Sequence, residues 1–138
     1  MQLAQLNILL VEDNPDDSFL LMSMLEETGL QPESVFQATR LSEGLEHLRS
    51  GTTDAVILDL SLPDSQGVAS VRGILEVAAN VPVIVLTGLD REEIGLEAIE
   101  AGAQDYLLKG KITAGDLRQS VVYGRVRRTA KNEERGGR

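Results

Sequence analysis

The sequence predicts an α/β fold: a doubly wound, flavodoxin-like sheet of five parallel strands in the order 2-1-3-4-5, with helices on both faces. Five short aliphatic segments alternate with five segments of helical periodicity, which is typical of parallel strands joined by helices. Such crossovers are right-handed, and the order 2-1-3-4-5 satisfies this rule. The 138 residues are enough for one domain with its own core.

Each predicted strand is a short aliphatic run bounded by turn residues. The third reads Asp-Ala-Val-Ile-Leu-Asp, and its apolar interior is typical of a strand buried on both faces. Pro82 stands near the start of the fourth strand, where a proline is tolerated. The five predicted strands are 7–11, 34–38, 54–59, 81–87 and 104–108.

The first predicted helix begins after Asn14, a good N-cap residue, and Pro15 suits its first turn. Asp16 and Asp17 favour the positive end of the helix dipole. Gly29 ends the helix, and its predicted buried face consists of Phe19, Met22 and either Met24 or Leu25.

The later helices show similar local patterns. The i, i+4, i+7 spacing of Leu41, Leu45 and Leu48 marks the second helix, which Gly51 closes. The third and fourth are predicted over 67–79 and 91–101. A capping box from Thr113 to Asp116 opens the last one, in which Leu117, Val121 and Val122 can face the sheet.

Charge and composition exclude several classes of function. The net charge is −9, and residues 1–124 carry 20 acidic and 7 basic side chains, so the body is not expected to bind nucleic acid. No apolar run reaches the length of a membrane span, and the first residues lack the features of a signal peptide. The chain has no cysteine. A cytoplasmic location without membrane contact is therefore expected.

Reactive side chains follow four of the predicted strands. Glu12 and Asp13 leave the first strand, Asp59 ends the third, Thr87 ends the fourth and Lys109 follows the fifth. Each residue alone has an ordinary interpretation as a cap or a solvated loop residue. Together they matter, because the carboxyl ends of parallel strands meet at one edge, where doubly wound folds bind ligands.

The charges at this edge complement one another. Asp13 and Asp59 would repel each other if both were ionised and unpaired, and a hard divalent cation removes that repulsion. Mg²⁺ favours oxygen ligands from one or two carboxylates, water and a phosphate. Lys109 and Thr87 can each hold a further phosphate oxygen. The set is suited to a phosphoryl group on Asp59.

Four segments in this order and spacing resemble the motifs of the receiver domains of two-component response regulators: ILLVEDNPDD, VILDLSLPDSQG, VIVLTG and GAQDYLLKG. The resemblance covers about residues 6–124. It implies a Mg²⁺-dependent phosphoacceptor, with Mn²⁺ as an alternative metal, that takes a phosphoryl group onto Asp59 and catalyses only its own phosphorylation and dephosphorylation.

The resemblance also implies the roles of the other site residues. Asp13 and Asp59 are metal ligands with the backbone carbonyl of Ser61, and Glu12 acts through metal-bound water. The phosphoryl oxygens are bound by the side chains of Thr87 and Lys109 and by the backbone N–H groups of Leu60 and Gly88. Tyr106 holds the position of the aromatic residue that turns inward as Thr87 moves toward the phosphoryl group.

The sequence departs from the family pattern after Lys109, where receivers commonly have a proline preceded by a cis peptide bond. Gly110 stands there instead. A cis bond before a residue other than proline costs roughly 3–4 kcal/mol, so we expect a trans bond and a reshaped loop.

Other functions were weighed against this one. An electron carrier of the same fold needs a hydroxyl- and glycine-rich phosphate loop after the first strand, where this chain has Glu12 and Asp13. A haloacid-dehalogenase-type phosphatase needs an acid where Ser61 stands. The remaining alternative is a metal-binding pseudo-receiver that acts only as a protein interaction module.

The resemblance implies partners as well. The donor is a sensor histidine kinase or a histidine phosphotransfer protein, and the output is a partner protein or a further domain. A homodimer through the fourth helix, fifth strand and fifth helix is an additional expectation. We place the receiver domain at 1–124, followed by a basic polar segment at 125–138 that either is solvated or continues the last helix as a connector.

Overall fold

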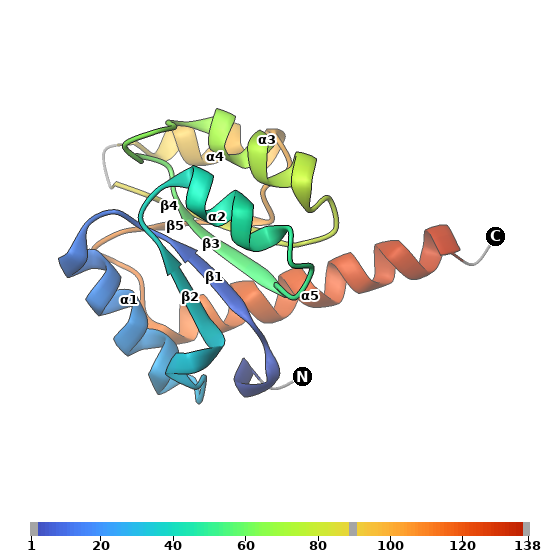
Figure 1. The fold of residues 1–138 in the computed structure, drawn as a ribbon, viewed down its shortest axis with the longest axis horizontal. Coiled ribbons are helices and arrows are strands. Elements are labelled where there is room, and N and C mark those ends of the chain that lie inside the picture. The colour runs from blue at the N-terminus through green and yellow to red at the C-terminus, as the bar shows by residue number, and fades with distance from the viewer. Residues whose placement is uncertain (1–2, 89–90, 137–138) are drawn as a thin grey trace.

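The computed structural model contains a five-stranded sheet in the order β2-β1-β3-β4-β5, with every neighbouring pair parallel (Figure 1). The structure describes residues 3–88 and 91–136, except for the side chains of residue 4 and of residues 128–136. The predicted fold class and strand order are confirmed.

The strands lie where the sequence predicts them but begin one or two residues later. Their bounds are β1 (Ile8–Val11), β2 (Val35–Ala38), β3 (Ala55–Asp59), β4 (Val83–Thr87) and β5 (Asp105–Leu108). The largest difference is at β4, because Pro82 has no N–H group to donate to a ladder and the strand starts after it. All residues of the inner strands β1, β3 and β4 are buried.

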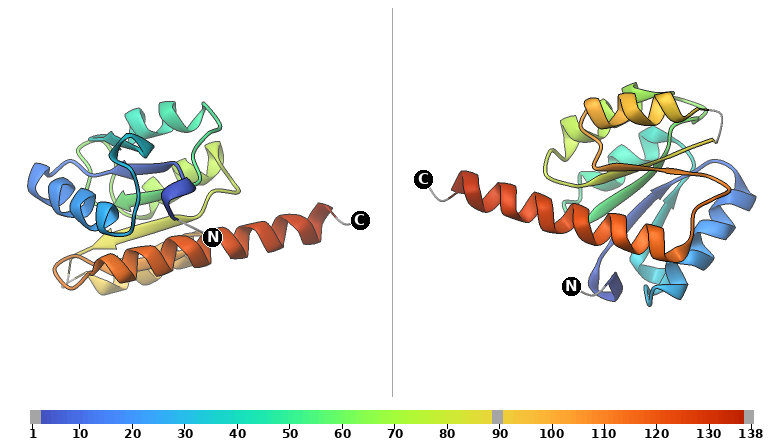
Figure 2. Two further views of the ribbon diagram at one scale, coloured as in Figure 1. Left: turned by 90° about the horizontal axis from the view of Figure 1, so that it is seen from below. Right: turned by 180° about the vertical axis from the view of Figure 1, so that it is seen from behind.

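Helices cover both faces of the sheet (Figure 2). Their bounds are α1 (Pro15–Glu27), α2 (Leu41–Leu48), α3 (Val68–Val77), α4 (Glu92–Glu100) and α5 (Ala114–Gly136), with short 3-10 helices at Leu3–Gln5 and Pro32–Ser34. Side chains from α2, α3 and α4 form one core with the sheet, and those from α1 and α5 form the other. No described helix is long and apolar enough to cross a membrane.

Both predicted helix starts with a capping side chain are confirmed. The Asn14 side chain accepts hydrogen bonds from the N–H groups of Asp16 and Asp17, at 2.9 and 3.1 Å. At α5, Thr113 and Asp116 each accept a hydrogen bond from the backbone N–H of the other, at 3.1 and 3.0 Å. Local sequence therefore sets where the helix that follows β1 begins and where the last helix begins.

The predicted buried face of α1 is partly wrong. Leu21 and Leu25 face the sheet, whereas Phe19 is 72% exposed. Leu21 and Leu25 are four residues apart and lie on one side of the helix, which turns Phe19 outward. Met22 and Met24 are partly buried at the edge of this core.

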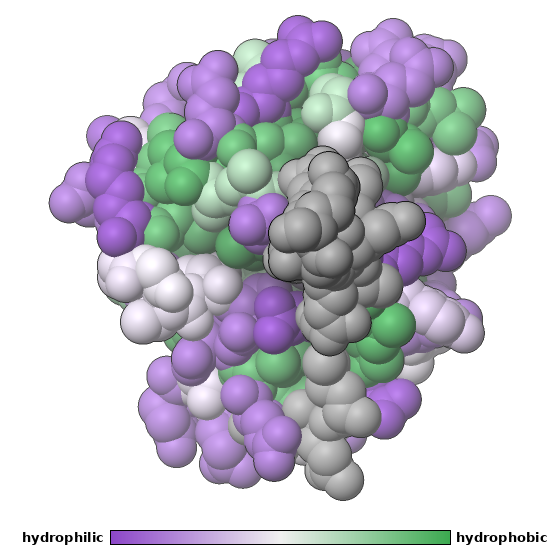
Figure 3. All heavy atoms as spheres, turned by 90° about the vertical axis from the view of Figure 1, so that its right-hand side faces the viewer, coloured by the Kyte–Doolittle hydropathy of each residue, from purple (hydrophilic) through white to green (hydrophobic). Residues whose placement is uncertain are grey.

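α5 continues well past the body of the domain (Figures 1 and 2). Leu117 and Val121 are buried against the sheet, and Arg125 lies 3.6 Å from Asp54. Beyond Arg125 the helix runs on to Gly136, and the role of this segment as a connector stays a prediction. Hydrophilic and hydrophobic side chains are interspersed on the end of the body that faces the projecting helix (Figure 3).

Candidate metal and phosphoryl site

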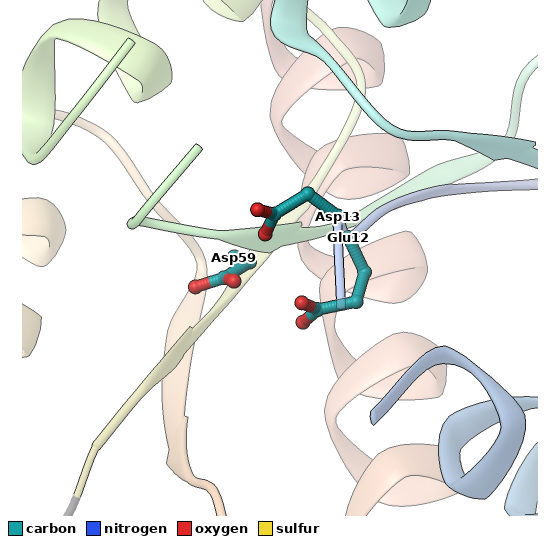
Figure 4. A group of neighbouring side chains, drawn as sticks. All are labelled: Glu12, Asp13 and Asp59. Atoms are coloured by element: carbon teal, nitrogen blue, oxygen red, sulfur yellow. The ribbon is translucent and has the colours of Figure 1, made fainter. Parts of the chain in front are cut away.

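Three carboxylates meet at the carboxyl ends of β1 and β3. The register pairs Val11 with Leu58, which brings the residues after β1 beside the last residue of β3. One oxygen from each of Glu12, Asp13 and Asp59 lies within 4.8 Å of the other two, and the three carboxylates point toward a common space (Figure 4). Glu12 and Asp59 are buried and Asp13 is exposed, so the cluster is open to solvent on one side.

Lys109 crosses to this cluster from the end of β5. Its Nζ lies 2.7 Å from Glu12 Oε2 and 3.1 Å from Asp59 Oδ2. A third carboxylate, Asp17 Oδ2 on α1, is 3.0 Å away. The local sequence indicates only a helix-start role for Asp17. Asp17 follows Asp13 by four residues, in the first turn of α1, so its side chain could have been expected near the strand end and near Lys109.

Burial and charge shift the acidity of this group of side chains. Burial raises the pKa of the Glu12 carboxyl to about 7, although hydrogen bonds from Lys109 and from the Asn14 N–H act in the opposite direction. Burial also works against the Lys109 ammonium. The carboxylates of Glu12 and Asp17 outweigh it and raise the pKa of Lys109 above its usual range. Lys109 is therefore a permanent positive charge at the site.

The Thr87 hydroxyl is a hydrogen-bond donor without an acceptor among the described residues. It is buried at the end of β4 and forms no hydrogen bond with any residue that the structure describes. Thr87 lines a small cavity of about 30 Å³ with Leu60, Ser61 and Gly88. Since a buried hydroxyl without a partner is unfavourable, this position suits a ligand oxygen.

Two of the predicted backbone groups, the Leu60 N–H and the Ser61 carbonyl, lie in the loop after β3. The Ser61 N–H donates to Asp59 Oδ1 at 3.0 Å, which fixes the orientation of that carboxylate. The Leu60 N–H donates to the Leu86 carbonyl at 3.4 Å, a long hydrogen bond. The roles of the Leu60 and Gly88 N–H groups and of the Ser61 carbonyl stay predictions.

Asp64 ties the same loop to α2. Its carboxylate accepts hydrogen bonds from the N–H groups of Leu41 and Ser42, at 2.8 and 3.0 Å. The N-cap residue of α2, Arg40, makes no side-chain cap hydrogen bond. The bonds from the N–H groups of Ser42 and Leu41 lower the pKa of Asp64. A residue 23 positions away therefore caps this helix, a contact that the sequence analysis missed.

The predicted trans peptide bond after Lys109 is confirmed. Gly110 has φ +89°, a conformation that side-chain-bearing residues rarely adopt. The departure from proline is therefore accommodated by the backbone freedom of glycine.

Tyr106 on β5 rests against α4. A Cβ added at Gly95 would lie 2.5 Å from Tyr106 Cδ2, so the ring occupies space that only a glycine leaves open. The Tyr106 hydroxyl donates to Glu92 Oε1 at 3.0 Å, and this hydrogen bond raises the pKa of Tyr106. The ring is half-buried, and it is held beside α4 by packing at Gly95 and by the hydrogen bond to Glu92.

The donor set fits a hard cation. Glu12, Asp13 and Asp59 offer only carboxylate oxygens, and one side of the cluster is exposed, as Mg²⁺ requires if it is to keep water ligands. Lys109 pairs with Glu12 and Asp59 and also with Asp17, so its one positive charge is divided among three carboxylates, and Asp13 adds a fourth to the site. This excess of negative charge favours a divalent cation.

Comparison with known proteins identifies the family. A family model described as the response regulator receiver domain matches residues 8–122. The chain belongs to this family. The receiver match ends inside α5, and the helix continues for 14 residues beyond it, to Gly136.

Individual relatives agree with this assignment. The KDP operon transcriptional regulatory protein KdpE of Escherichia coli is 40% identical over 103 residues, which are 75% of this chain and 44% of KdpE. The chemotaxis protein CheY of Thermotoga maritima is 26% identical over 102 residues, 74% of this chain and 83% of CheY. The chain thus spans less than half the length of KdpE.

Solved structures share the fold. A response regulator receiver domain protein from Clostridium thermocellum superposes with a TM-score of 0.78 at 28% identity, over 89% of this chain and 96% of that one. NtrX from Brucella abortus superposes with a TM-score of 0.83 at 24% identity, over 100% of this chain and 30% of NtrX.

Proposed function

We propose that this receiver domain is a phosphoacceptor that takes a phosphoryl group from a histidine onto Asp59. The observation that carries the proposal is the surroundings of Asp59. Its carboxylate lies between two further acids and the Lys109 ammonium, close to a cavity lined by the buried Thr87 hydroxyl, which has no hydrogen-bond partner among the described residues. The lysine, the hydroxyl and a cation could hold an anion there, and these are groups that phosphoryl transfer needs.

The transfer step follows from this arrangement. An Asp59 carboxylate oxygen attacks phosphorus. The new O–P bond forms as the P–N bond to the donor histidine breaks, and the electron pair of that bond returns to the imidazole nitrogen. Lys109 and Thr87 each donate a hydrogen bond to a phosphoryl oxygen, which offsets the charge that gathers there. In the return step water attacks phosphorus, the O–P bond to Asp59 breaks, and inorganic phosphate leaves, which restores the Asp59 carboxylate. These two reactions are the only ones catalysed.

Asp13, Asp59 and the Ser61 carbonyl are the groups that would hold Mg²⁺, or Mn²⁺, with Glu12 acting through water. Bound there, the metal supplies electrostatic stabilisation of the phosphoryl oxygens. Because Asp13 is exposed, one side of the cluster is open to the donor.

The proposed output is a conformational switch. Thr87 moves toward the phosphoryl group, and the Tyr106 ring leaves its place against Gly95 and turns inward, which breaks its hydrogen bond to Glu92. The changed surface is formed by α4, β5 and α5. It serves an output domain or partner protein, or a second copy of the chain, and the acidic body makes direct nucleic acid binding by this domain unfavourable.

The test of phosphorylation is incubation with acetyl phosphate and Mg²⁺, followed by intact mass measurement. We expect one phosphoryl group on the wild type and none on Asp59→Asn. Asp54→Asn is the matched control, because it makes the same change at the other end of β3, and it should be labelled like the wild type. Equal labelling of Asp59→Asn and wild type would show that the assignment is wrong.

The switch has its own test. When beryllofluoride is added with Mg²⁺, amide shifts should extend from Thr87 to Tyr106 and over α4 and α5. Binding with shifts confined to the strand ends would favour a pseudo-receiver, which binds metal and acts only as an interaction module.

A further inference from the structure

Lys109 has one partner that the proposed chemistry does not use. Its ammonium faces three carboxylates, at 2.7 Å from Glu12, 3.1 Å from Asp59 and 3.0 Å from Asp17. Glu12 and Asp59 belong to the three-carboxylate cluster, and Asp17 does not. When a metal and a phosphoryl group engage Glu12 and Asp59, the Asp17 carboxylate therefore stays free to pair with Lys109.

The three contacts cannot all persist in the phosphorylated state. An ammonium has three N–H donors, and here three carboxylates already surround it, so a phosphoryl oxygen would be a fourth acceptor. In the proposed phosphorylated state the oxygens of Glu12 and Asp59 turn toward the metal and the phosphoryl group. Asp17 has no such role, so its carboxylate is the contact that Lys109 can keep while a donor turns to a phosphoryl oxygen.

The backbone around the two residues supports this role for Asp17. The Asp17 N–H is bonded to the Asn14 side chain at 3.1 Å, so the residue sits on a capped first turn of α1. On the other side, Lys109 is followed by Gly110, with φ +89°. Glycine leaves the loop after Lys109 freer than a proline would. The ion pair with Asp17, which lies on a fixed helix turn, therefore restricts the position of the Lys109 side chain, whereas the loop after Lys109 does not.

We propose that Asp17 is a positioning residue for phosphoryl transfer: it anchors Lys109 at the rim of the site before and after the phosphoryl group arrives. This inference rests on the proposed phosphoacceptor function. The opposite role, in which Asp17 competes with the phosphoryl group for Lys109, predicts the opposite sign for its removal.

The test compares two neighbouring charge removals. Asp17→Asn takes one negative charge from the first turn of α1 and with it the ion pair. Asp16→Asn removes the same charge one residue earlier, at an exposed side chain that does not pair with Lys109 in the described part of the chain. Labelling by acetyl phosphate is followed at saturating Mg²⁺, and beryllofluoride affinity is measured for each protein.

For Asp17→Asn we expect the labelling rate and the beryllofluoride affinity to fall by about two- to fivefold, the effect of losing a partly exposed ion pair. Asp16→Asn should match the wild type, and Asp17→Glu should restore most of the loss. Equal behaviour of Asp17→Asn and Asp16→Asn would overturn the proposal, as would faster labelling of Asp17→Asn. An unlabelled wild type would instead overturn the proposed function.

A second measurement separates positioning from a general loss of structure. In the Mg²⁺-bound wild type the two ε-methylene protons of Lys109 should have distinct NMR shifts, because the ammonium is held. In Asp17→Asn they should merge, while the melting temperature stays equal to that of Asp16→Asn. Distinct shifts in Asp17→Asn would show that Lys109 is held without Asp17 and would overturn the proposal.

Discussion

Strand β3 has an aspartate at each end, and the two have opposite surroundings. Asp54, just before the strand, accepts a hydrogen bond from the Asn7 N–H at 2.7 Å and lies 3.6 Å from the Arg125 guanidinium. Asp59, its last residue, faces Glu12 and Asp13 and shares Lys109 with Glu12 and Asp17. The first carboxylate is neutralised within the protein, and the second is left with an excess of negative charge. What a carboxylate can do at a strand end thus depends on how many donors and charges the fold brings to it.

The largest expected difference between the two ends of β3 is in Mg²⁺ affinity. We expect Asp13→Asn to weaken Mg²⁺ binding by about tenfold or more, since losing even a partner of a metal ligand commonly costs that much affinity. Asp54→Asn should leave the affinity unchanged. The measurement is an amide-shift titration with Mg²⁺. An unchanged affinity in Asp13→Asn would remove Asp13 from the site.

The loop that follows Asp59 gives the next largest effect. Asp64→Ala removes the acceptor for two N–H groups at the start of α2 and should lower the free energy of unfolding by about 1–2 kcal/mol. Urea denaturation measures it. Asp64→Asn is the matched control, because the amide oxygen keeps one acceptor, and it should lose less. Equal losses in both variants would show that the cap acts through charge alone.

The same residue predicts a pH dependence. The pKa of Asp64 is lower in the folded protein than in the unfolded chain, so the ionised carboxylate stabilises the fold above the unfolded value of about 3.9. This stabilisation is lost as the pH falls through the lowered folded pKa. The stability difference between wild type and Asp64→Ala should therefore be smaller at pH 3 than at pH 7. A difference that grows toward pH 3 would contradict this sign.

The smallest expected effect is on the free energy of unfolding measured in EDTA, where variants at the two ends of β3 should change it in opposite directions. Asp54→Asn should lower the free energy of unfolding by about 1 kcal/mol, because the Asn7 N–H and Arg125 lose a charged partner. Asp13→Asn should raise it by about 0.5 kcal/mol, because one of three clustered charges is removed. Changes of the same sign would show that the two ends of β3 do not differ as proposed.

Much of the fold and of the candidate site could be predicted from sequence, for a local reason. The alternation of aliphatic runs with helical spacing sets the order of elements, and the rule for right-handed crossovers restricts the strand orders to a few that include 2-1-3-4-5. Once the strands are known, Asp13, Asp59 and Lys109 must converge, because parallel strands bring their carboxyl ends to one edge. Capping by Asn14 is equally local.

Other features depend on how far a loop reaches or how a helix is rotated, which the residues of one segment do not determine by themselves. Phe19 is exposed because α1 turns Leu21 and Leu25 toward the sheet. The Asp64 cap joins residues 23 positions apart, and the Asp17 contact with Lys109 spans 92.

The sequence by itself determined the parallel sheet, its strand order and the set of charged residues at its carboxyl edge, because these follow from periodicity and chain order. Only the tertiary structure decided which charges are paired. α5 brings Arg125 to Asp54 at one end of β3, whereas at the other end Lys109 is divided among Asp59, Glu12 and Asp17. The physical reason is that an ion pair requires a few ångströms between atoms that the chain itself leaves far apart.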